Sequence, residues 1–294
     1  MEKITNYPVY VPSHKRAKSA LTARYFLKCG TPFKLVIEPR QEDDYKEFKN
    51  HLILLDENND TGSSLPVRNF ISQHSISEGH KRHWQFDDNI RSFRRLHRGC
   101  RVHVNSTKAI QIVEEFTDRY TNIGVSGFDY EMFVVDTCKK PIVTNVHVYS
   151  ACLINNEMPY RHRLLYNEDT DLCLQVVTNG LCTVQFKTLM VEKMRTMTMA
   201  GGNADQIYKG KGRLKMARSL EEVWPEHVET AWRFGRPQHR IKKNWTQFTT
   251  PLKRNPELDW DAIKNKRYSF KLKQVRETDC WQMKKYRDEQ NEQN

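Results

Sequence analysis

Short apolar runs alternate with amphipathic stretches through the first third of the chain. Apolar runs of strand length recur there, at residues 7–11, 34–37, 52–55 and 83–86. Stretches whose apolar residues have helical spacing lie between them, at residues 19–29, 41–49 and 66–77. Gly30 follows the first of these, in the position where glycine commonly ends a helix. Strands that alternate with helices predict an α/β fold with parallel strands.

The alternation changes in the second half of the chain. A helix that begins at a Ser106 cap is predicted to reach Tyr120, and a flexible glycine-containing loop follows at residues 124–127. Two apolar runs, at residues 132–135 and 146–154, then succeed one another with no helix between them. The sheet is therefore expected to become mixed or antiparallel in this half.

The remaining segments predict two more helices, one more strand and a loop. The first helix opens in the acidic cluster at residues 166–171 and ends at Asn179-Gly180. A strand, a mobile loop and the second helix follow in that order, over residues 182–186, 194–212 and 219–234.

Composition indicates a folded, intracellular protein. Of the 294 residues, 38% are hydrophobic, and six are Trp. With no repeat or low-complexity linker, we expect one domain over residues 1–245 and a basic, partly irregular extension over residues 246–294. No apolar run is long enough to span a membrane, and no signal-like segment follows Met1.

The seven cysteines form no Cys-x-x-Cys pair, which favours buried reduced thiols over zinc ligands or disulfides.

Charge favours a polyanionic partner. Lys and Arg outnumber Asp and Glu by 48 to 36, which gives a formal net charge of +12. From Arg236 to the end, 15 basic and 8 acidic residues carry +7 of that charge. Nucleic acid is the first candidate partner for such a balance.

Two acidic clusters follow predicted elements. Asp87 and Asp88 stand directly after the fourth predicted strand, at the edge where open α/β sheets bind ligands. They form either a strand-ending turn or a site for a metal ion and phosphates. The second cluster, residues 166–171, opens a helix, where the helix dipole alone also favours acidic side chains.

Taken together, several short motifs resemble those of a GT-A nucleotide-sugar glycosyltransferase over residues 7–245. They are Tyr10-Val11-Pro12-Ser13-x-x-Arg16, Pro66-x-Arg68-Asn69-Phe70, Ser75, Gly79, Trp84-x-x-Asp87-Asp88-Asn89 and Asn167-Glu168-Asp169-Thr170-Asp171. More closely, the chain resembles the TET-associated glycosyltransferases of phage DNA-hypermodification systems. The resemblance implies a GT-A-like (Rossmann-like) mixed sheet flanked by helices. It also implies transfer of a sugar from a UDP-sugar to the hydroxyl of 5-hydroxymethylcytosine in DNA, in the cytoplasm of an infected bacterium.

The resemblance also implies a donor site. Asp87 and Asp88 supply oxygen ligands for Mg²⁺ or Mn²⁺, which neutralises the leaving diphosphate. One of the two binds the metal, and the other binds either the metal or the ribose or sugar. A further metal contact is expected from His239. The other donor-binding residues expected are Pro12, Ser13, Arg16, Glu38, Arg68 and Asn69.

Catalysis requires a base for the acceptor hydroxyl. By resemblance this base is Asp169, with Glu168 or Asp171 as the next candidates, and a single base of this kind gives inversion. A covalent or front-face route would instead retain configuration. The Gly201-Gly202-Asn203 run is either a lid over the donor or a simple connector.

DNA contacts are expected from two basic regions. One is the stretch 91–101 with Arg94 and Arg95, and the other contains Arg240, Lys242 and Lys243. The enzyme would reach the 5-position either in the major groove or by flipping the base out. The alternatives are a GT-A transferase with a protein or small-molecule acceptor, a metal-dependent nuclease, and a DNA-binding module without catalysis.

Overall fold

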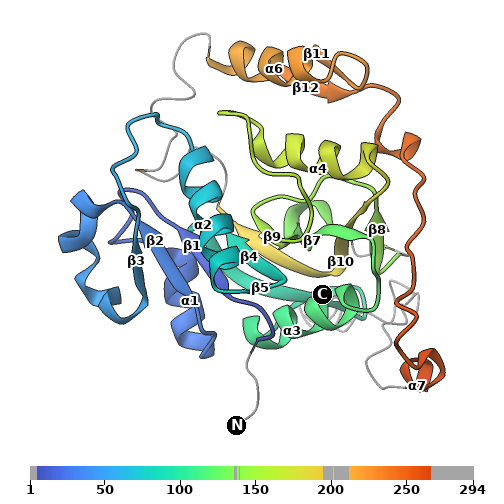
Figure 1. The fold of residues 1–294 in the computed structure, drawn as a ribbon, viewed down its shortest axis with the longest axis horizontal. Coiled ribbons are helices and arrows are strands. Elements are labelled where there is room, and N and C mark those ends of the chain that lie inside the picture. Colours follow the sequence, from blue (N-terminus) through green and yellow to red (C-terminus); the bar gives the residue numbers. More distant parts are fainter. Residues whose placement is uncertain (1–4, 136–137, 139, 195–200, 202–211, 266–294) are drawn as a thin grey trace, which may run out of the picture.

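The computed structural model describes residues 5–135, 138, 140–194, 201 and 212–265 of the chain. A ten-stranded mixed sheet forms its centre, and helices cover both faces (Figure 1). The strand order is β3-β2-β1-β4-β9-β7-β10-β5-β6, and β8 pairs with β10 beside this path. The predicted α/β class, a mixed sheet flanked by helices, is confirmed.

The first half of the chain builds the parallel part of the sheet. Its strands are β1 (Val9–Pro12), β2 (Lys34–Ile37), β3 (Leu52–Leu54) and β4 (Arg82–Phe86). β1 pairs in parallel with β2 and β4, and β2 pairs in parallel with β3. The connections are α1 (Leu21–Cys29), the 3₁₀ helix η1 (Pro39–His51) and α2 (Leu65–Ser77). Gly30 ends α1 at a φ of 69°, so the predicted glycine cap is confirmed.

The second half makes the sheet mixed, as expected. Its elements are β5 (Ile90–His97), β6 (Cys100–His103), α3 (Ser106–Thr117), β7 (Ile123–Tyr130), η2 (Glu131–Phe133), β8 (Ile142–Thr144), β9 (Ala151–Asn155), α4 (Glu168–Thr178) and β10 (Cys182–Lys193). β9 runs antiparallel between β4 and β7, while β10 is parallel to β7 and antiparallel to β5.

Two expectations for strands were wrong. Residues 124–127, expected to be a loop, lie inside β7. A Cβ on Gly127 would lie 2.0 Å from the Ala151 carbonyl oxygen, so this glycine allows two backbones to approach closely. The run at residues 132–135 is not a strand, because the chain turns through η2 there.

Two further details differ from expectation. The basic stretch at residues 91–101, which gave no strand signal, forms most of the β5–β6 hairpin. Asn105, not Ser106, caps α3, because its side chain accepts a hydrogen bond from the Lys108 amide at 3.2 Å.

Helices cover the two faces of the sheet in pairs. Side chains of α1 and α3 share one apolar cluster with the sheet residues Val11, Phe86 and Phe93. The alternate strand positions point the other way, so Tyr10 and Val36 meet α2, and Val125 meets α4. α4 thus lies on the same face as α2, which brings its first turn toward the ends of β1 and β4.

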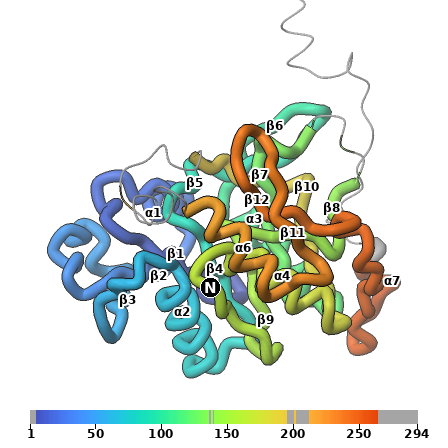
Figure 2. The backbone as a smooth tube through the Cα atoms, turned by 90° about the horizontal axis from the view of Figure 1, so that it is seen from above, coloured from blue at the N-terminus to red at the C-terminus, as the bar shows by residue number. Residues whose placement is uncertain are grey.

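A small unit packs on the outside of α4. It contains α6 (Gly212–Val223) and the hairpin of β11 (Val228–Arg233) and β12 (Arg236–Ile241). The helix expected over residues 219–234 therefore ends early, and its last residues form a strand. Leu174 of α4 packs against Leu220, Val228 and Ile241, and Figures 1 and 2 show the unit lying above α4.

The chain after this unit follows the surface of the domain. It contains η3 (Trp245–Gln247) and α7 (Trp260–Asn265). Asn122 donates to the Pro251 carbonyl at 2.9 Å, and Tyr120 packs on Trp260. The boundary at residue 246 stays a prediction, and most of the proposed extension, residues 266–294, lies outside the described residues.

Four of the six described cysteines are buried as predicted, while Cys29 and Cys138 are partly exposed. The six cysteines within the described residues are free thiols. Among the described helices, none combines the length and the apolar character needed to cross a bilayer. The loop expected over residues 194–212 lies outside the described part of the chain except for Met194, Gly201 and Gly212.

Candidate active site

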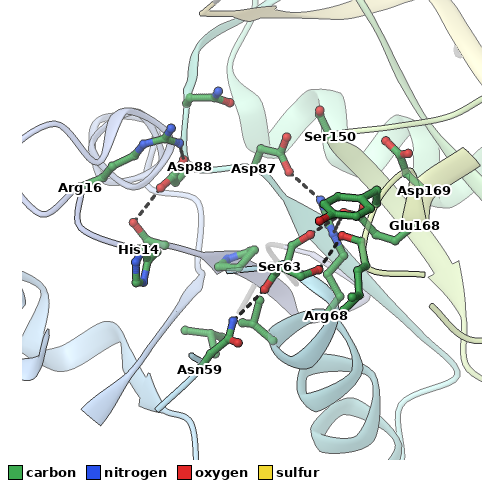
Figure 3. Close-up of a pocket in the computed structure, with 18 of the residues that line it drawn as sticks. His14, Arg16, Asn59, Ser63, Arg68, Asp87, Asp88, Ser150, Glu168 and Asp169 are labelled. Atoms are coloured by element: carbon green, nitrogen blue, oxygen red, sulfur yellow. Dashed lines mark hydrogen bonds and ion pairs between the residues drawn. The ribbon is translucent and has the colours of Figure 1, made fainter. Parts of the chain in front are cut away.

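A pocket of about 370 Å³ opens at the carboxyl ends of β1, β2 and β4 (Figure 3). Its walls include Ser13 after β1, Glu38 after β2 and the Asp87-Asp88 pair after β4. The first turn of α4 supplies Glu168 and Asp169. The two acidic clusters of the sequence therefore line one pocket, on the ligand-binding edge of the sheet.

Asp88 is held by the loop that follows β1. Its Oδ1 accepts from Arg16 Nη1 at 2.5 Å, and its Oδ2 accepts from Ser13 Oγ at 2.9 Å. The Thr22 amide donates to the Asp88 carbonyl at 3.2 Å, which ties the end of β4 to the start of α1. Burial raises the pKa of Asp88, and Arg16 opposes that shift.

Asp87 pairs with two buried cations. Its Oδ1 lies 3.0 Å from Arg68 Nη2, and its Oδ2 lies 2.7 Å from Lys193 Nζ. Burial alone would raise the pKa of Asp87, but Lys193 and Arg68 outweigh it and hold the pKa below its usual range. Asp87 is therefore ionised at neutral pH.

Lys193 comes from the last position of β10. Its ammonium also contacts Tyr130 Oη at 3.1 Å and Ser150 Oγ at 2.6 Å. Burial would lower its pKa, but the Asp87 charge outweighs burial and raises the pKa above its usual range. A permanent positive charge therefore lines the pocket beside Asp87.

Arg68 of α2 links the two acidic clusters. Besides Asp87, its Nε donates to Glu168 Oε1 at 2.9 Å, and its Nη1 donates to Gln85 Oε1 at 3.2 Å. Only 10% of the Arg68 side chain is exposed, so its three partners fix the orientation of the guanidinium. Ser64 Oγ also donates to Glu168 Oε1, at 2.6 Å.

Asp169 contacts a backbone amide and a histidine, whereas Glu168 forms an ion pair with an arginine. Its Oδ1 accepts from the Thr170 amide at 2.7 Å and lies 3.5 Å from His147 Nε2. Burial would raise the pKa of Asp169, but His147 outweighs it and keeps the pKa below its usual range. The Asp169 side chain is 28% exposed, so its carboxylate is accessible from the pocket.

Part of the pocket lining is apolar. Its apolar members include Pro12, Val36, Ile37, Leu55 and Val67. Glu38 also lines the pocket, is almost fully buried, and pairs with His14 at 2.7 Å and Arg40 at 2.6 Å. Apolar lining together with a buried carboxylate suits a nucleoside, whose base is flat and whose ribose carries hydroxyl donors.

Two expected site residues lie outside this pocket lining. Asn69 points away and donates to the His162 carbonyl at 2.9 Å. His239 lies on β12, opposite Thr230. Burial lowers the pKa of His239 to about 4.

The donor set suits a divalent cation. Asn89 Oδ1 is buried without a hydrogen-bond partner beside the Asp87-Asp88 pair, and Asn89 lines the pocket. Amide and carboxylate oxygens are the ligands that Mg²⁺ and Mn²⁺ take. Within the described residues, no group of three His, Cys, Asp or Glu side chains clusters tightly enough to hold a metal alone. A cation there would take its other ligands from the substrate or water.

The charges of the lining residues also favour a divalent cation. Five carboxylates line the pocket and outnumber its Lys and Arg side chains, which among the described residues are Arg16, Arg68 and Lys193. A diphosphate would add more negative charge to this set. A divalent cation would offset that addition.

Sequence reasoning missed Lys193, Tyr130, Ser150 and His147. These residues come from the ends of β10 and β7 and from the loop before β9, far along the chain from Asp87. No motif marks them. Ser150 has a φ of 64°, a left-handed conformation that the sequence does not signal at a serine.

The residues expected to contact DNA differ in availability. Arg94 Nη2 pairs with Glu192 at 2.8 Å, and Arg94 Nε lies 3.2 Å from Glu131. Arg240 pairs with Glu229, and Lys242 donates to the Pro225 carbonyl at 2.5 Å. Arg95 and Lys243 are exposed.

One family model matches this chain. A model of the family described as TET-Associated Glycosyltransferase matches residues 7–202, more than half of the chain. Among solved structures, the chain is similar to mannose-1-phosphate geranyltransferase from Thermus thermophilus. That similarity has 7% identity and a TM-score of 0.30, and covers 83% of this chain and 68% of the other. No curated protein sequence matches the chain.

Proposed function

This chain belongs to the TET-associated glycosyltransferase family, and from that premise we propose that it glycosylates 5-hydroxymethylcytosine in DNA with a UDP-sugar as donor. Membership of this family shows that the chain is a glycosyltransferase. The donor, the acceptor and the stereochemistry are what we propose. Such an enzyme would work where phage DNA is made, in the cytoplasm of the infected bacterium. One observation carries the proposal: the Asp87-Asp88 pair and Asp169 line a single pocket.

The donor diphosphate would lie near the ends of β1 and β4. Arg16, Arg68 and Lys193 provide fixed positive charge around it. When UDP leaves, negative charge grows on its terminal phosphate, and charges already in place stabilise that change. Arg16 and Arg68 suit this role because a guanidinium can contact two phosphate oxygens at once.

A divalent cation is part of the proposal. Asp87, Asp88 and Asn89 are the residues that would hold it, by their side-chain oxygens. When bound, it would supply Lewis-acid stabilisation of the departing diphosphate. His239 is not needed for this role, because it does not line the pocket.

Asp169 would act as the catalytic base. The hydroxymethyl oxygen of the acceptor attacks the anomeric carbon of the sugar, and its proton passes to the Asp169 carboxylate. The bond from that carbon to the UDP oxygen breaks, and UDP leaves with the electron pair. Attack from the side opposite UDP inverts the anomeric carbon.

Glu168 fits a positioning role better than the base role. Its Oε1 accepts hydrogen bonds from Arg68 and Ser64, so the carboxylate is already engaged. Asp171 is fully buried and binds Arg163, Gln175 and Trp224 instead of facing the pocket. Of the three acidic candidates, Asp169 has the most accessible carboxylate.

A donor screen tests the proposal. The protein is incubated with Mn²⁺ or Mg²⁺, a panel of UDP-sugars and DNA that contains 5-hydroxymethylcytosine, and the DNA is digested to nucleosides for mass spectrometry. We expect one sugar mass on hydroxymethylcytosine and none on cytosine. Transfer only to proteins or small molecules would refute the DNA acceptor, and DNA cleavage without sugar transfer would refute the whole proposal.

The base assignment has its own test in that assay. Asp169→Asn should lower kcat by at least about a hundredfold while UDP binding, measured by calorimetry, stays unchanged. Asp43→Asn, at an exposed carboxylate on η1, is the matched control and should keep full activity. Full turnover by Asp169→Asn with intact UDP binding would end the assignment.

A further inference from the structure

Two large aromatic side chains stand in water at the tip of the β11–β12 hairpin. Trp232 is 73% exposed and Phe234 is 85% exposed, the highest values among the exposed large hydrophobic residues that the structure describes. Folding normally removes such side chains from water, so their exposure indicates a surface that is completed by a partner.

The hairpin turn holds Phe234 outward in a strained conformation. Phe234 and Gly235 form a two-residue turn, and their φ values are 53° and 72°. Positive φ at both positions is typical of a type I′ turn, which favours Asn-Gly and rarely accepts a bulky residue. The strain at Phe234 is not offset by burial, which is typical of a residue kept for contact with a ligand.

Two arginines flank the hairpin turn, and the Arg233 guanidinium lies over the Phe234 ring, 5.8 Å from its centroid. Arg233 and Arg236 lie directly opposite each other at the end of the two strands, where like charges destabilise a hairpin. Arg240, Lys242 and Lys243 follow on the same hairpin and the turn after it, and Glu229 is the acidic residue between Val228 and Trp245. This combination of exposed aromatics and clustered arginines matches a nucleic acid, whose phosphates pair with cations and whose bases stack on rings.

The strand register places Trp232 on the face of the hairpin that packs against α4. Directly opposed residues share one face of a hairpin. Val228 and Ile241 form one such pair, which packs against α4, and Thr230 and His239 form the next pair along the same face. Trp245, which follows β12, stacks on His147 with 6.0 Å between ring centroids, and His147 Nε2 lies 3.5 Å from Asp169 Oδ1.

Trp232 belongs to the third pair on that face. Its partner is Pro237, and this pair extends past the apolar cluster that holds the hairpin on α4. One face of the hairpin therefore runs from the apolar cluster on α4 to an exposed tryptophan.

We propose that the β11–β12 hairpin is a DNA wedge: Trp232 and Phe234 enter the base stack beside the acceptor cytosine while Arg233 and Arg236 contact phosphates. The cytosine leaves the stack and its hydroxymethyl group reaches Asp169. This inference rests on the proposed function, because it assumes a base in DNA as the acceptor. Many enzymes that act on a base inside a duplex flip it out of the stack, and inserted side chains fill the gap it leaves.

The wedge is tested by comparing a paired with a mispaired acceptor. Trp232→Ala/Phe234→Ala should lower kcat/KM for hydroxymethylcytosine in a fully paired duplex by roughly 10- to 100-fold, since each substitution removes an aromatic ring on which a base would stack. The loss should be several times smaller when the acceptor stands opposite an abasic site, where the base is easily exposed. Leu27→Ala, at an exposed apolar residue of α1, is the matched control and should behave as wild type on both substrates.

A binding measurement separates this inference from the proposed function. Duplex DNA with 2-aminopurine beside the target should brighten when wild-type protein unstacks it, with no donor present. The double variant should bind without that brightening, and its thermal unfolding should match wild type because both side chains are exposed.

The outcomes are distinct. Brightening by wild type without sugar transfer to any substrate would refute the proposed acceptor and leave the wedge in place. Unchanged brightening and unchanged kcat/KM in the double variant would overturn the wedge, and would assign the exposed aromatics to a protein partner. An equal loss on paired and abasic duplexes would also overturn it, because the aromatics would then not act by opening the stack.

Discussion

The carboxylates of the pocket have different hydrogen-bond and ion-pair partners. These partners fit the carboxylates for different roles. Asp87 is paired on both oxygens with cations, and Asp88 is held by Arg16 and Ser13. Such carboxylates orient cations and metal ligands, but they are poor proton acceptors because each oxygen is engaged. Asp169 keeps a lightly bonded, ionised carboxylate near the exposed side of the pocket.

His147 should set the lower pH limit of activity. A base works when ionised, and His147 keeps the pKa of Asp169 below its usual range. His147→Gln removes the imidazole that lies 3.5 Å from Asp169 Oδ1, so the pKa of Asp169 should rise and a larger fraction of Asp169 should be protonated at acidic pH. We expect the acid limb of the kcat/KM profile to move up by about one pH unit, with little change at about pH 8.

The pH profile needs a control at another histidine. His103→Gln changes an exposed histidine of β6, remote from the pocket lining, and should leave the acid limb in place. If the limb stays fixed in His147→Gln as well, His147 does not govern the pKa of Asp169.

Lys193 should contribute to the chemical step more than to the fold. Lys193→Met keeps the length and apolar stem of the side chain but removes the charge beside Asp87. We expect kcat to fall about a hundredfold, a loss typical of removing one group that stabilises developing charge. Lys46→Met, at an exposed lysine, is the control, and equal kcat values for the two variants would contradict this role.

At the scale of elements, the sequence predicted the features that depend only on neighbouring residues. Strands β2 and β4, the end of α1 at Gly30 and the acidic start of α4 follow from apolar spacing and capping residues. The strand ends then indicate where Ser13, Asp87 and Asp88 lie. Lys193 could not be found in this way, because 106 residues separate it from Asp87 and only the path of β10 brings them together.

The same limit explains the missed strand β7. Two glycines at residues 124–127 indicate a loop when only neighbours in sequence are considered. In the folded sheet they serve close packing, since a Cβ on Gly124 would lie 2.9 Å from the Val176 side chain and one on Gly127 would meet the Ala151 backbone. Close approach of two backbones is a tertiary property, which a single sequence does not display.

Gly127→Ala should therefore destabilise the protein. The added methyl would lie 2.0 Å from the Ala151 carbonyl oxygen, so β7 and β9 must move apart. We expect the free energy of unfolding in urea to fall by about 3 kcal/mol. Gly124→Ala is the graded comparison and should cost less, because the atoms it meets belong to a side chain; equal losses would argue against backbone contact as the cause.

At the scale of the whole molecule, a net charge of +12 does not say which cations meet DNA. The sequence favours Arg94 as a DNA contact, yet Glu192 and Glu131 neutralise it in the folded protein. On the β11–β12 hairpin, Arg240 pairs with Glu229, and Glu221 of α6 accepts a hydrogen bond from the Thr230 amide at 3.1 Å. Arg233 and Arg236 lie at the other end of the hairpin, next to the turn and the exposed aromatics.

Salt dependence of DNA binding distinguishes these two groups of cations. Removing one cation that pairs with a phosphate should reduce the slope of log Kd against log salt by about one. Arg236→Gln and Lys243→Gln should each show that reduction, because these residues lie at or beside the hairpin proposed to meet DNA. Arg94→Gln is the matched control: its slope should equal wild type, while its melting temperature falls because Glu192 loses a partner at 2.8 Å. The reverse pattern, with a lower slope only in Arg94→Gln, would place the DNA on the β5–β6 hairpin and away from the β11–β12 hairpin.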